Sequence, residues 1–256
     1  MSLPSLSGKV AIVTGAGQGM GAATAKLFAT AGANVVVADM NKEMGEEVVQ
    51  AILAAGGTAF FQPTNVTKSS DIEAMVAAAV KQYGKLDVAV NNAAIVALSD
   101  PFETMDEDEF DRIIAVDLRG VALCLKYEIR QMQSQGGGGS IINIGSTSSF
   151  RPQPNNAAYV AAKHGVVGLT RVAALENGAR GIRVNTVAPG AIDTPMLRNA
   201  LETLGATEAE FAPVLSLLNR FGKPEEVAQA SLWLASDLSS YVTGTTINVD
   251  AGYCNR

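Results

Sequence analysis

The stretch "KVAIVTGAGQGMGAATAKLFATAG" (residues 9–32) decides the fold of this chain. Residues 9–15 form a nearly continuous apolar run, which predicts a strand that is buried on both faces. Residues 19–32 predict a helix that is closed by Gly32. Gly15, Gly19 and Gly21 lie where the two elements meet, so the chain can turn tightly between the strand and the helix.

The same alternation of strand and helix continues along the chain. Apolar runs predict further strands at 34–39, 58–62, 86–92, 140–146, 182–190 and 245–250. Helical patterns lie between them at 41–57, 69–83, 106–133, 156–177 and 223–236. Buried strands joined by helical crossovers predict an α/β fold, with a doubly wound, mainly parallel sheet and helices on both faces. No linker interrupts the pattern, and we interpret "QGGGG" (135–139) as a surface turn, so residues 1–256 are predicted to form one domain.

The composition argues against several classes of partner. The net charge is −6 and there is no basic cluster, so we expect neither nucleic acid nor an anionic membrane surface as a partner. The sequence shows no secretory leader pattern and no apolar run of about 18 residues. Cys124 and Cys254 are far apart, and no cysteine or histidine pair has metal-ligand spacing. We therefore expect a reduced, cytoplasmic protein without a transition-metal site.

An acidic residue ends the second predicted strand. Asp39 lies 24 residues after Gly15. In such a unit the glycines let the backbone approach a diphosphate at the helix N-terminus, and the acid can accept both hydroxyls of an adenosine ribose. The acid also repels a 2′-phosphate, and no Arg or Lys lies in the turn or directly after Asp39. The pattern favours NAD over NADP as cofactor; the structural alternative is that Asp39 caps the helix starting near residue 41.

A tyrosine and a lysine lie four residues apart in "AAYVAAKHG" (157–165), among mostly small neighbours. This spacing is one helical turn, so Tyr159 and Lys163 share a face. Lowering a phenol pKa from about 10 by roughly three units takes about 4 kcal/mol of preferential phenolate stabilisation, part of which a nearby ammonium supplies. Tyr159 could then take the proton of an alcohol whose hydride leaves for a nicotinamide ring. The alternative is a packing tyrosine beside a solvated lysine.

Four stretches taken together resemble the short-chain dehydrogenase/reductase family. They are "TGAGQGMG" (14–21), "VNNAA" (90–94), "YVAAK" (159–163) and "PGAIDT" (189–194), with Ser146 at the end of the strand predicted at 140–146. The resemblance runs from about residue 8 to 252 in the family's order and spacing. It implies a Rossmann-like sheet of seven strands and a reversible oxidoreductase of carbonyls and alcohols.

The resemblance also implies roles for single residues. Ser146 would hydrogen-bond the substrate oxygen, Tyr159 would be the acid/base, and Lys163 would lower the tyrosine pKa and bind ribose. The candidate cofactor contacts combine the residues that the resemblance implies with those of the glycine turn and the acid of the second strand. They are Gly15, Gln18, Gly19, Met20, Gly21, Asp39, Asn65, Val66, Asn92, Tyr159, Lys163, Ile192 and Thr194. The candidate substrate contacts are Ser146, Tyr159, Ile95, Val96, Ser148, Phe150 and Gln153.

This chain departs from the family pattern at three positions. Asn65 stands where the family usually has Asp, and Ala94 stands where it usually has Gly. The third departure is Asp117 in "AVDLRG" (115–120), at the place of a catalytic Asn that helps hold a water, partly through its backbone carbonyl. An ionised Asp117 keeps that carbonyl, but its side chain has lost two donors and places a negative charge near Lys163. We expect activity to survive, and we keep Asp117 among the candidate catalytic residues.

The same resemblance implies that the family commonly assembles as a homotetramer, through the helices at 106–133 and 156–177 and the final strand. It also implies that residues from about 195 to 222 form a mobile substrate lid. The lid is largely apolar, and its only cations are Arg198 and Arg220. This favours a small apolar or cyclic secondary alcohol or ketone as substrate; alternatively, the lid leucines pack on the body or on a neighbouring subunit.

Two other functions stay open at this point. One is a dinucleotide-binding sensor that performs no chemistry, which the unusual Asp117 permits but an intact set of Ser146, Tyr159 and Lys163 disfavours. The other is an enoyl-type reductase, although such relatives usually space the tyrosine and lysine more widely.

Overall fold

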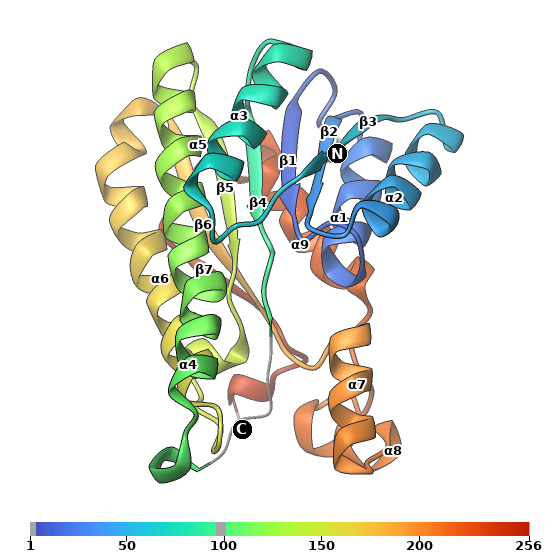
Figure 1. The fold of residues 1–256 in the computed structure, drawn as a ribbon. Coiled ribbons are helices and arrows are strands. Elements are labelled where there is room, and N and C mark those ends of the chain that lie inside the picture. The colour runs from blue at the N-terminus through green and yellow to red at the C-terminus, as the bar shows by residue number, and fades with distance from the viewer. Residues whose placement is uncertain (1–3, 96–100, 256) are drawn as a thin grey trace.

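The computed structural model describes residues 4–95 and 101–255. Seven strands form one sheet in the order β3-β2-β1-β4-β5-β6-β7, and every neighbouring pair is parallel (Figure 1). The strands are β1 (Val10–Thr14), β2 (Asn34–Asp39), β3 (Thr58–Pro63), β4 (Val88–Asn91), β5 (Gly139–Ile144), β6 (Ile182–Pro189) and β7 (Thr246–Val249). The prediction of a doubly wound parallel sheet is confirmed.

Helices cover both faces of this sheet (Figure 1). They are α1 (Gly19–Thr30), α2 (Lys42–Ala54), α3 (Ser69–Tyr83), α4 (Glu107–Ile114), α5 (Val121–Gln135), α6 (Ala157–Asn177), α7 (Pro195–Leu204), α8 (Glu208–Leu215) and α9 (Pro224–Ala235). Ala11 and Val13 of β1 belong to the core with α1, α2 and α9, whereas Val10 and Ile12 belong to the core with α3, α5 and α6. Two cores explain why this strand is apolar along its whole length. Among the described residues, no helix is both long and apolar enough to cross a membrane.

The helix predicted at 106–133 is in fact interrupted. A π-helical turn (Ala115–Gly120) separates α4 from α5. It holds Asp117, which is fully buried, and its last residue, Gly120, lies so close to Val66 that a Cβ there would be 3.0 Å from Val66 Cγ2. A pattern of apolar residues does not record a single wide turn, so the sequence predicted one continuous helix. Such π turns are frequent at functional sites.

Residues 195–222, the segment predicted to be a lid, contain helices that the sequence analysis did not predict. Thr194 accepts a hydrogen bond from Leu197 N, and Pro195 follows it in the first turn of α7, which is a typical helix start. A capping box between Thr207 and Glu210 starts α8. The two helices extend away from the sheet (Figure 1) and have a small apolar core of their own, made by Leu201, Ala212 and Phe221.

The parallel arrangement brings the candidate site residues to one edge of the sheet. The carboxyl ends of neighbouring strands point the same way, and the strand order reverses between β1 and β4. At this edge, Asp39 ends β2, and the segments that follow β1, β3, β4, β5 and β6 carry Gly15, Asn65, Asn92, Ser146 and Thr194. In open α/β sheets, ligands bind at such an edge, where the order reverses.

Candidate active site

The glycine turn after β1 packs so closely against the end of β4 and against itself that side chains do not fit at two of its positions. Gly15 has a φ of +62°, and a Cβ on it would be 2.8 Å from the Cα of Ala93. A Cβ on Gly21 would collide with the carbonyl oxygen of Gly15. The turn runs into α1, whose N-cap residue Gln18 makes no side-chain capping hydrogen bond. The helix start therefore offers uncapped N–H groups and a positive dipole end, which suit a diphosphate.

Asp39 holds this turn from the end of β2. Its Oδ2 accepts the Gly17 N–H at 2.8 Å, and its Oδ1 accepts the Asn41 N–H at 2.9 Å. Asp39 does not cap α2, because Asn41 is the N-cap and accepts the Met44 N–H at 3.1 Å. The capping alternative is therefore wrong. Each carboxylate oxygen keeps a further lone pair, so the side chain can still accept two ribose hydroxyls.

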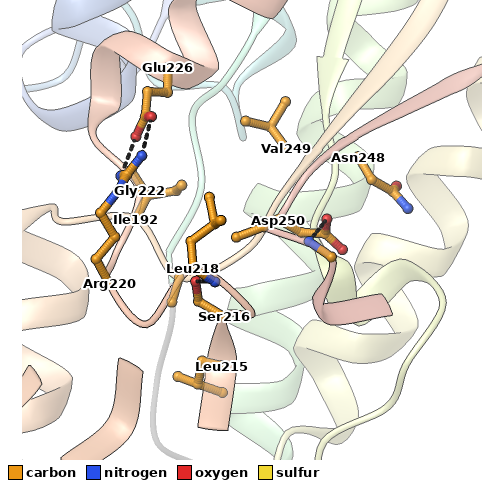
Figure 2. A pocket seen from close by; sticks show the side chains of 13 residues that line it. Ile192, Leu215, Ser216, Leu218, Arg220, Gly222, Glu226, Asn248, Val249 and Asp250 are labelled. Carbon is orange, nitrogen blue, oxygen red and sulfur yellow. Dashed lines mark hydrogen bonds and ion pairs between the residues drawn. The ribbon is translucent and has the colours of Figure 1, made fainter. Parts of the chain in front are cut away.

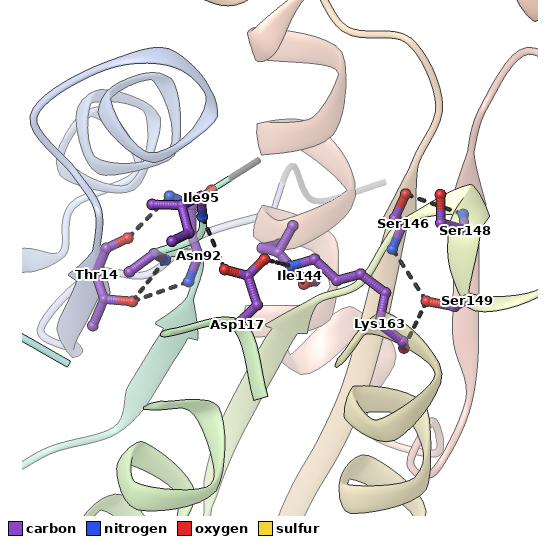
Figure 3. Close-up of polar contacts among 10 residues, drawn as sticks. Thr14, Asn92, Ile95, Asp117, Ile144, Ser146, Ser148, Ser149 and Lys163 are labelled. Carbon is purple, nitrogen blue, oxygen red and sulfur yellow. Dashed lines mark hydrogen bonds and ion pairs between the residues drawn. The ribbon is translucent and has the colours of Figure 1, made fainter. Parts of the chain in front are cut away.

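Asn92 joins the end of β4 to the glycine turn. Its Nδ2 donates to the carbonyl oxygens of Thr14 (3.0 Å) and Gly15 (3.1 Å), and the Thr14 hydroxyl accepts the N–H groups of Asn92 and Ala93 (Figure 3). Ala94, the departure from the family's glycine, is not among the described residues with positive φ. The alanine therefore needs no left-handed backbone, and the departure causes no strain of that kind.

The remaining cofactor candidates lie on both sides of the turn. Asn65 uses its Oδ1 within its own loop, where it accepts the N–H and the hydroxyl of Thr67, and Val66 is buried. Ile192 is buried too and pairs with Gly222. Thr194 packs near the turn, since a Cβ on Gly19 would be 3.4 Å from Thr194 Cγ2. In α1 and at its cap, Met20 is half-buried and Gln18 is exposed.

Tyr159 and Lys163 share one face of α6, as the spacing predicts. The Lys163 ammonium lies 5.4 Å from the centroid of the Tyr159 ring. The lysine side chain is only 2% exposed, and its Nζ donates to the Ile144 carbonyl oxygen at 3.2 Å. The alternative of a solvated lysine is therefore wrong. The ammonium is a fixed positive charge beside a half-buried tyrosine.

Asp117 is the counter-ion of this lysine. Its Oδ2 lies 3.3 Å from Lys163 Nζ, and its Oδ1 accepts the Ile95 N–H at 2.9 Å (Figure 3). Burial raises the pKa of Asp117, and the positive charge of Lys163 offsets part of this rise. Burial lowers the pKa of Lys163, but the negative charge and the contact of Asp117, together with a smaller contribution from the neighbouring Tyr159, outweigh the effect of burial, so that pKa is raised. Lys163 is thus held as a cation.

Ser146 follows β5 and is almost fully buried. Its Oγ accepts the Ser148 N–H at 3.1 Å, which leaves the hydroxyl proton free to be donated to a substrate oxygen. The sequence analysis missed Ser149, whose Oγ accepts the Ser146 N–H and donates to the Lys163 carbonyl oxygen at 2.8 Å. Ser149 therefore ties the Ser146 loop to α6. The serine-rich run "STSS" (146–149) was the available signal.

The candidate substrate contacts differ in their exposure. Phe150 is 43% exposed and Gln153 is half-buried, so both can meet a ligand. Ser148 is buried, and Ile95 is half-buried and is held through its N–H by Asp117. Val96 lies outside the described residues.

A cavity of about 280 Å³ lies between the lid and the end of β7 (Figure 2). Among the residues that line it are Ile192, Leu215, Leu218 and Asp250, whereas Ser146, Tyr159 and Lys163 do not line it.

Both arginines of the predicted lid segment are paired with acidic side chains. Arg198 contacts Asp193 (2.6 Å) and Glu208 (3.1 Å), and Arg220 contacts Glu226 at 2.7 Å, so each already has an acidic partner.

Known proteins are similar to nearly the whole chain. A family model described as Enoyl-(Acyl carrier protein) reductase matches residues 15–254. The short chain dehydrogenase/reductase astE of Aspergillus oryzae is 53% identical, over 97% of this chain and 95% of that protein. The 2,5-dichloro-2,5-cyclohexadiene-1,4-diol dehydrogenase of Sphingobium indicum is 43% identical, over 97% and 98%. The crystal structure of levodione reductase matches with a TM-score of 0.93 and 36% identity, over 97% and 98%.

These relatives match in sequence and in fold, and they extend over both the glycine turn and the tyrosine-bearing helix. The resemblance drawn from the four sequence stretches is thereby confirmed, and the chain belongs to the short-chain dehydrogenase/reductase family.

Proposed function

We propose that this chain is an NAD(H)-dependent oxidoreductase that interconverts a secondary alcohol and a ketone, with Tyr159 as acid/base. The observation that carries the proposal is the buried ammonium of Lys163, held by Asp117 and the Ile144 carbonyl, 5.4 Å from the Tyr159 ring. A buried cation beside a phenol at the edge of a dinucleotide-type sheet supports proton transfer better than it supports packing. The first test is a screen of purified protein with NAD and NADP against secondary alcohols and ketones, following nicotinamide absorbance.

The residues present suit a nicotinamide dinucleotide. Gly15 and Gly21 let the turn pack against the end of β4 and against itself more closely than a Cβ would allow. The uncapped start of α1 suits the diphosphate, and Asp39 has lone pairs left for the adenosine ribose. Asn65, Val66, Asn92, Ile192 and Thr194 are proposed to complete the binding surface. When bound, such a cofactor accepts hydride from the alcohol carbon, or returns it to the carbonyl carbon.

The chain's own residues manage the proton. Ser146 donates a hydrogen bond from its hydroxyl group to the substrate oxygen. It can orient that oxygen because the Ser148 N–H already fixes the position of Ser146 Oγ. Tyr159 Oη, as phenolate, takes the hydroxyl proton of the alcohol during oxidation, and as phenol it protonates the alkoxide during reduction. Lys163 stabilises the phenolate, and it has a third N–H for ribose besides those directed at Ile144 and Asp117.

The substrate is proposed to be an apolar or cyclic secondary alcohol or ketone. Both lid arginines are already paired with acids, Phe150 offers an apolar surface, and the relative from Sphingobium indicum is named for a cyclic diol. In a panel of matched substrates, we expect kcat/KM for cyclohexanol-type alcohols to exceed that for carboxylated or phosphorylated analogues by at least about tenfold, or 1.4 kcal/mol. Turnover of strongly anionic substrates alone would contradict this proposal.

The preference for NAD is proposed to come from Asp39. Asp39→Asn keeps an oxygen acceptor for the Gly17 N–H but removes the charge that repels a 2′-phosphate. We expect the ratio of kcat/KM for NADP to that for NAD to rise by about tenfold or more, which corresponds to about 1.4 kcal/mol. Glu47→Gln, at an exposed position of α2, removes one charge nearby and should leave the ratio unchanged. If the ratio of kcat/KM for NADP to that for NAD is the same in the native chain and in Asp39→Asn, Asp39 does not determine the cofactor preference.

We also propose that the chain acts as a homotetramer. Val172 (53% exposed) and Leu175 (85% exposed) of α6 leave apolar side chains uncovered in the single chain, on a helix already proposed for subunit contacts. Static light scattering measures the assembly's mass directly.

A further inference from the structure

One carboxyl group of the core takes no part in the chemistry described so far. Glu128 lies on α5 and is completely buried. Its Oε2 accepts a hydrogen bond from Asn91 Nδ2 at 3.0 Å. Its Oε1, like Asn91 Oδ1, is a buried acceptor without a hydrogen-bond partner among the described residues. A full negative charge at a place already short of donors is costly, whereas a proton on the carboxyl removes the charge and adds a donor.

Asn91 links this carboxyl group to a chain of buried polar side chains. Asn91 Nδ2 also donates to Asn143 Oδ1 at 2.9 Å, and Asn143 Nδ2 donates to Thr170 Oγ1 at 2.9 Å. The Thr186 hydroxyl contacts Thr170 at 2.9 Å. The network therefore joins α5, β4, β5, α6 and β6, and buried networks of this kind fix the relative position of the elements that they connect.

Each member of the network on β4 and β5 is followed directly by a residue of the candidate site. Asn91 precedes Asn92, whose side chain holds the carbonyl oxygens of Thr14 and Gly15. Asn143 precedes Ile144, whose carbonyl oxygen accepts the Lys163 ammonium. A change at Glu128 thus reaches the glycine turn through two consecutive residues.

No cation neutralises Glu128 within the described part of the chain. Its titratable neighbour on α5 is Cys124, whose thiol pKa is raised by burial and by Glu128. On the elements packed against it, β4 and β5 carry no titratable side chain, and the buried ones of α6 and the π turn, Lys163 and Asp117, are paired with each other. The other titratable side chains of these elements are half-buried or exposed: Asp71, Glu73, Lys81, Tyr83, Arg119, Lys126, Tyr127, Arg130, Tyr159, His164, Arg171 and Glu176. Burial raises the pKa of Glu128 to about 7.

We infer that Glu128 is a positioning residue: as the uncharged acid it holds Asn91, and through Asn92 the glycine turn, in the form that binds the dinucleotide, and its loss of a proton releases that form. The ligand in this inference rests on the proposed function. Glu128 would thus make cofactor binding depend on pH, separately from the proton transfer at Tyr159.

The test compares the full-length chain with Glu128→Gln by titrating NADH fluorescence from pH 6 to 8. If only the protonated form binds, the native Kd rises about tenfold one pH unit above the Glu128 pKa. Glu128→Gln, which is uncharged at every pH, should vary less than twofold over this range. Glu176→Gln, at an exposed position of α6, is the matched control and should keep the native profile.

Thermal unfolding gives a readout that needs no cofactor. A carboxyl pKa raised in the folded state contributes stability that is present below the unfolded pKa and is lost as the pH rises through the folded value. Between pH 5 and pH 8, the native Tm should therefore fall by roughly 5 °C or more relative to Glu128→Gln. Should that variant not fold, infrared spectra of the native chain must still show a protonated-carboxyl band at pH 6 that disappears by pH 8.

The outcomes separate the two ideas. Absence of NADH and NAD binding at every pH would sink the proposed function but leave the Tm and infrared predictions standing. Binding with the same pH profile in the native chain and in Glu128→Gln, or absence of the titrating carboxyl band, would overturn the role of Glu128.

Discussion

Tyr159→Phe is expected to lower kcat by about 10³-fold while changing the dinucleotide Kd by less than about twofold. The substitution removes only the hydroxyl and keeps the ring 5.4 Å from the Lys163 ammonium. Packing on α6 and the Lys163–Asp117 pair therefore stay as they are, whereas the proton of the alcohol loses its acceptor. The expected loss lies in turnover, because the hydroxyl acts on the substrate oxygen and not on the adenosine end of the cofactor.

The measurements are steady-state kinetics with the best substrate of the panel, together with NADH fluorescence titration. Tyr241→Phe is the matched control. Tyr241 is fully exposed, and the substitution removes the same hydroxyl oxygen at a position away from the candidate site. A Tyr159→Phe protein with native turnover would remove Tyr159 from the chemistry. A native chain that binds the dinucleotide but turns over none of the alcohols or ketones would favour the alternative of a sensor without chemistry.

Much of the fold could be predicted because its signals are local. The buried run before the glycine turn and the acid at the end of the next strand lie within 31 residues (9–39), and both are predicted from the chemistry of adjacent side chains. The pairing of Tyr159 with Lys163 is also local, since one helical turn fixes it. The strand order then follows from parallel crossovers, and it carries the separate stretches to one edge of the sheet.

The features that could not be predicted depend on contacts between distant segments. Asp117 was visible as an unusual residue, but the π turn that directs it at Lys163 leaves no mark in the apolar pattern. Ser149 acts through the backbone of Ser146 and Lys163. The serine-rich run marks this loop, but it does not show which serine makes these contacts. Glu128 lies in the helix predicted at 106–133, but its burial against Asn91 depends on how α5 packs on β4.

The second large effect is expected from Lys163→Met, which should lower the free energy of unfolding by about 3–5 kcal/mol, beside abolishing turnover. The variant leaves the Asp117 carboxylate fully buried without its counter-ion. Its remaining hydrogen bond, from the Ile95 N–H, does not replace the lost positive charge. Because burial raises the pKa of an unpaired carboxyl group, the variant should regain stability as the pH falls from 8 to 5.

Asp117→Asn separates the charge effect from the loss of the lysine side chain. In the background of Lys163→Met it should restore most of the lost stability, since an amide still accepts the Ile95 N–H and carries no charge. Alone, Asp117→Asn should stay active, with the acidic limb of its pH–rate profile at lower pH, because the carboxylate no longer opposes the phenolate. Urea unfolding of the two single variants and the double variant measures the coupling. A double variant no more stable than Lys163→Met would show that the lost stability comes from packing and not from the unpaired charge. An inactive native chain beside an active Asp117→Asn variant would show that Asp117 blocks the chemistry at this position.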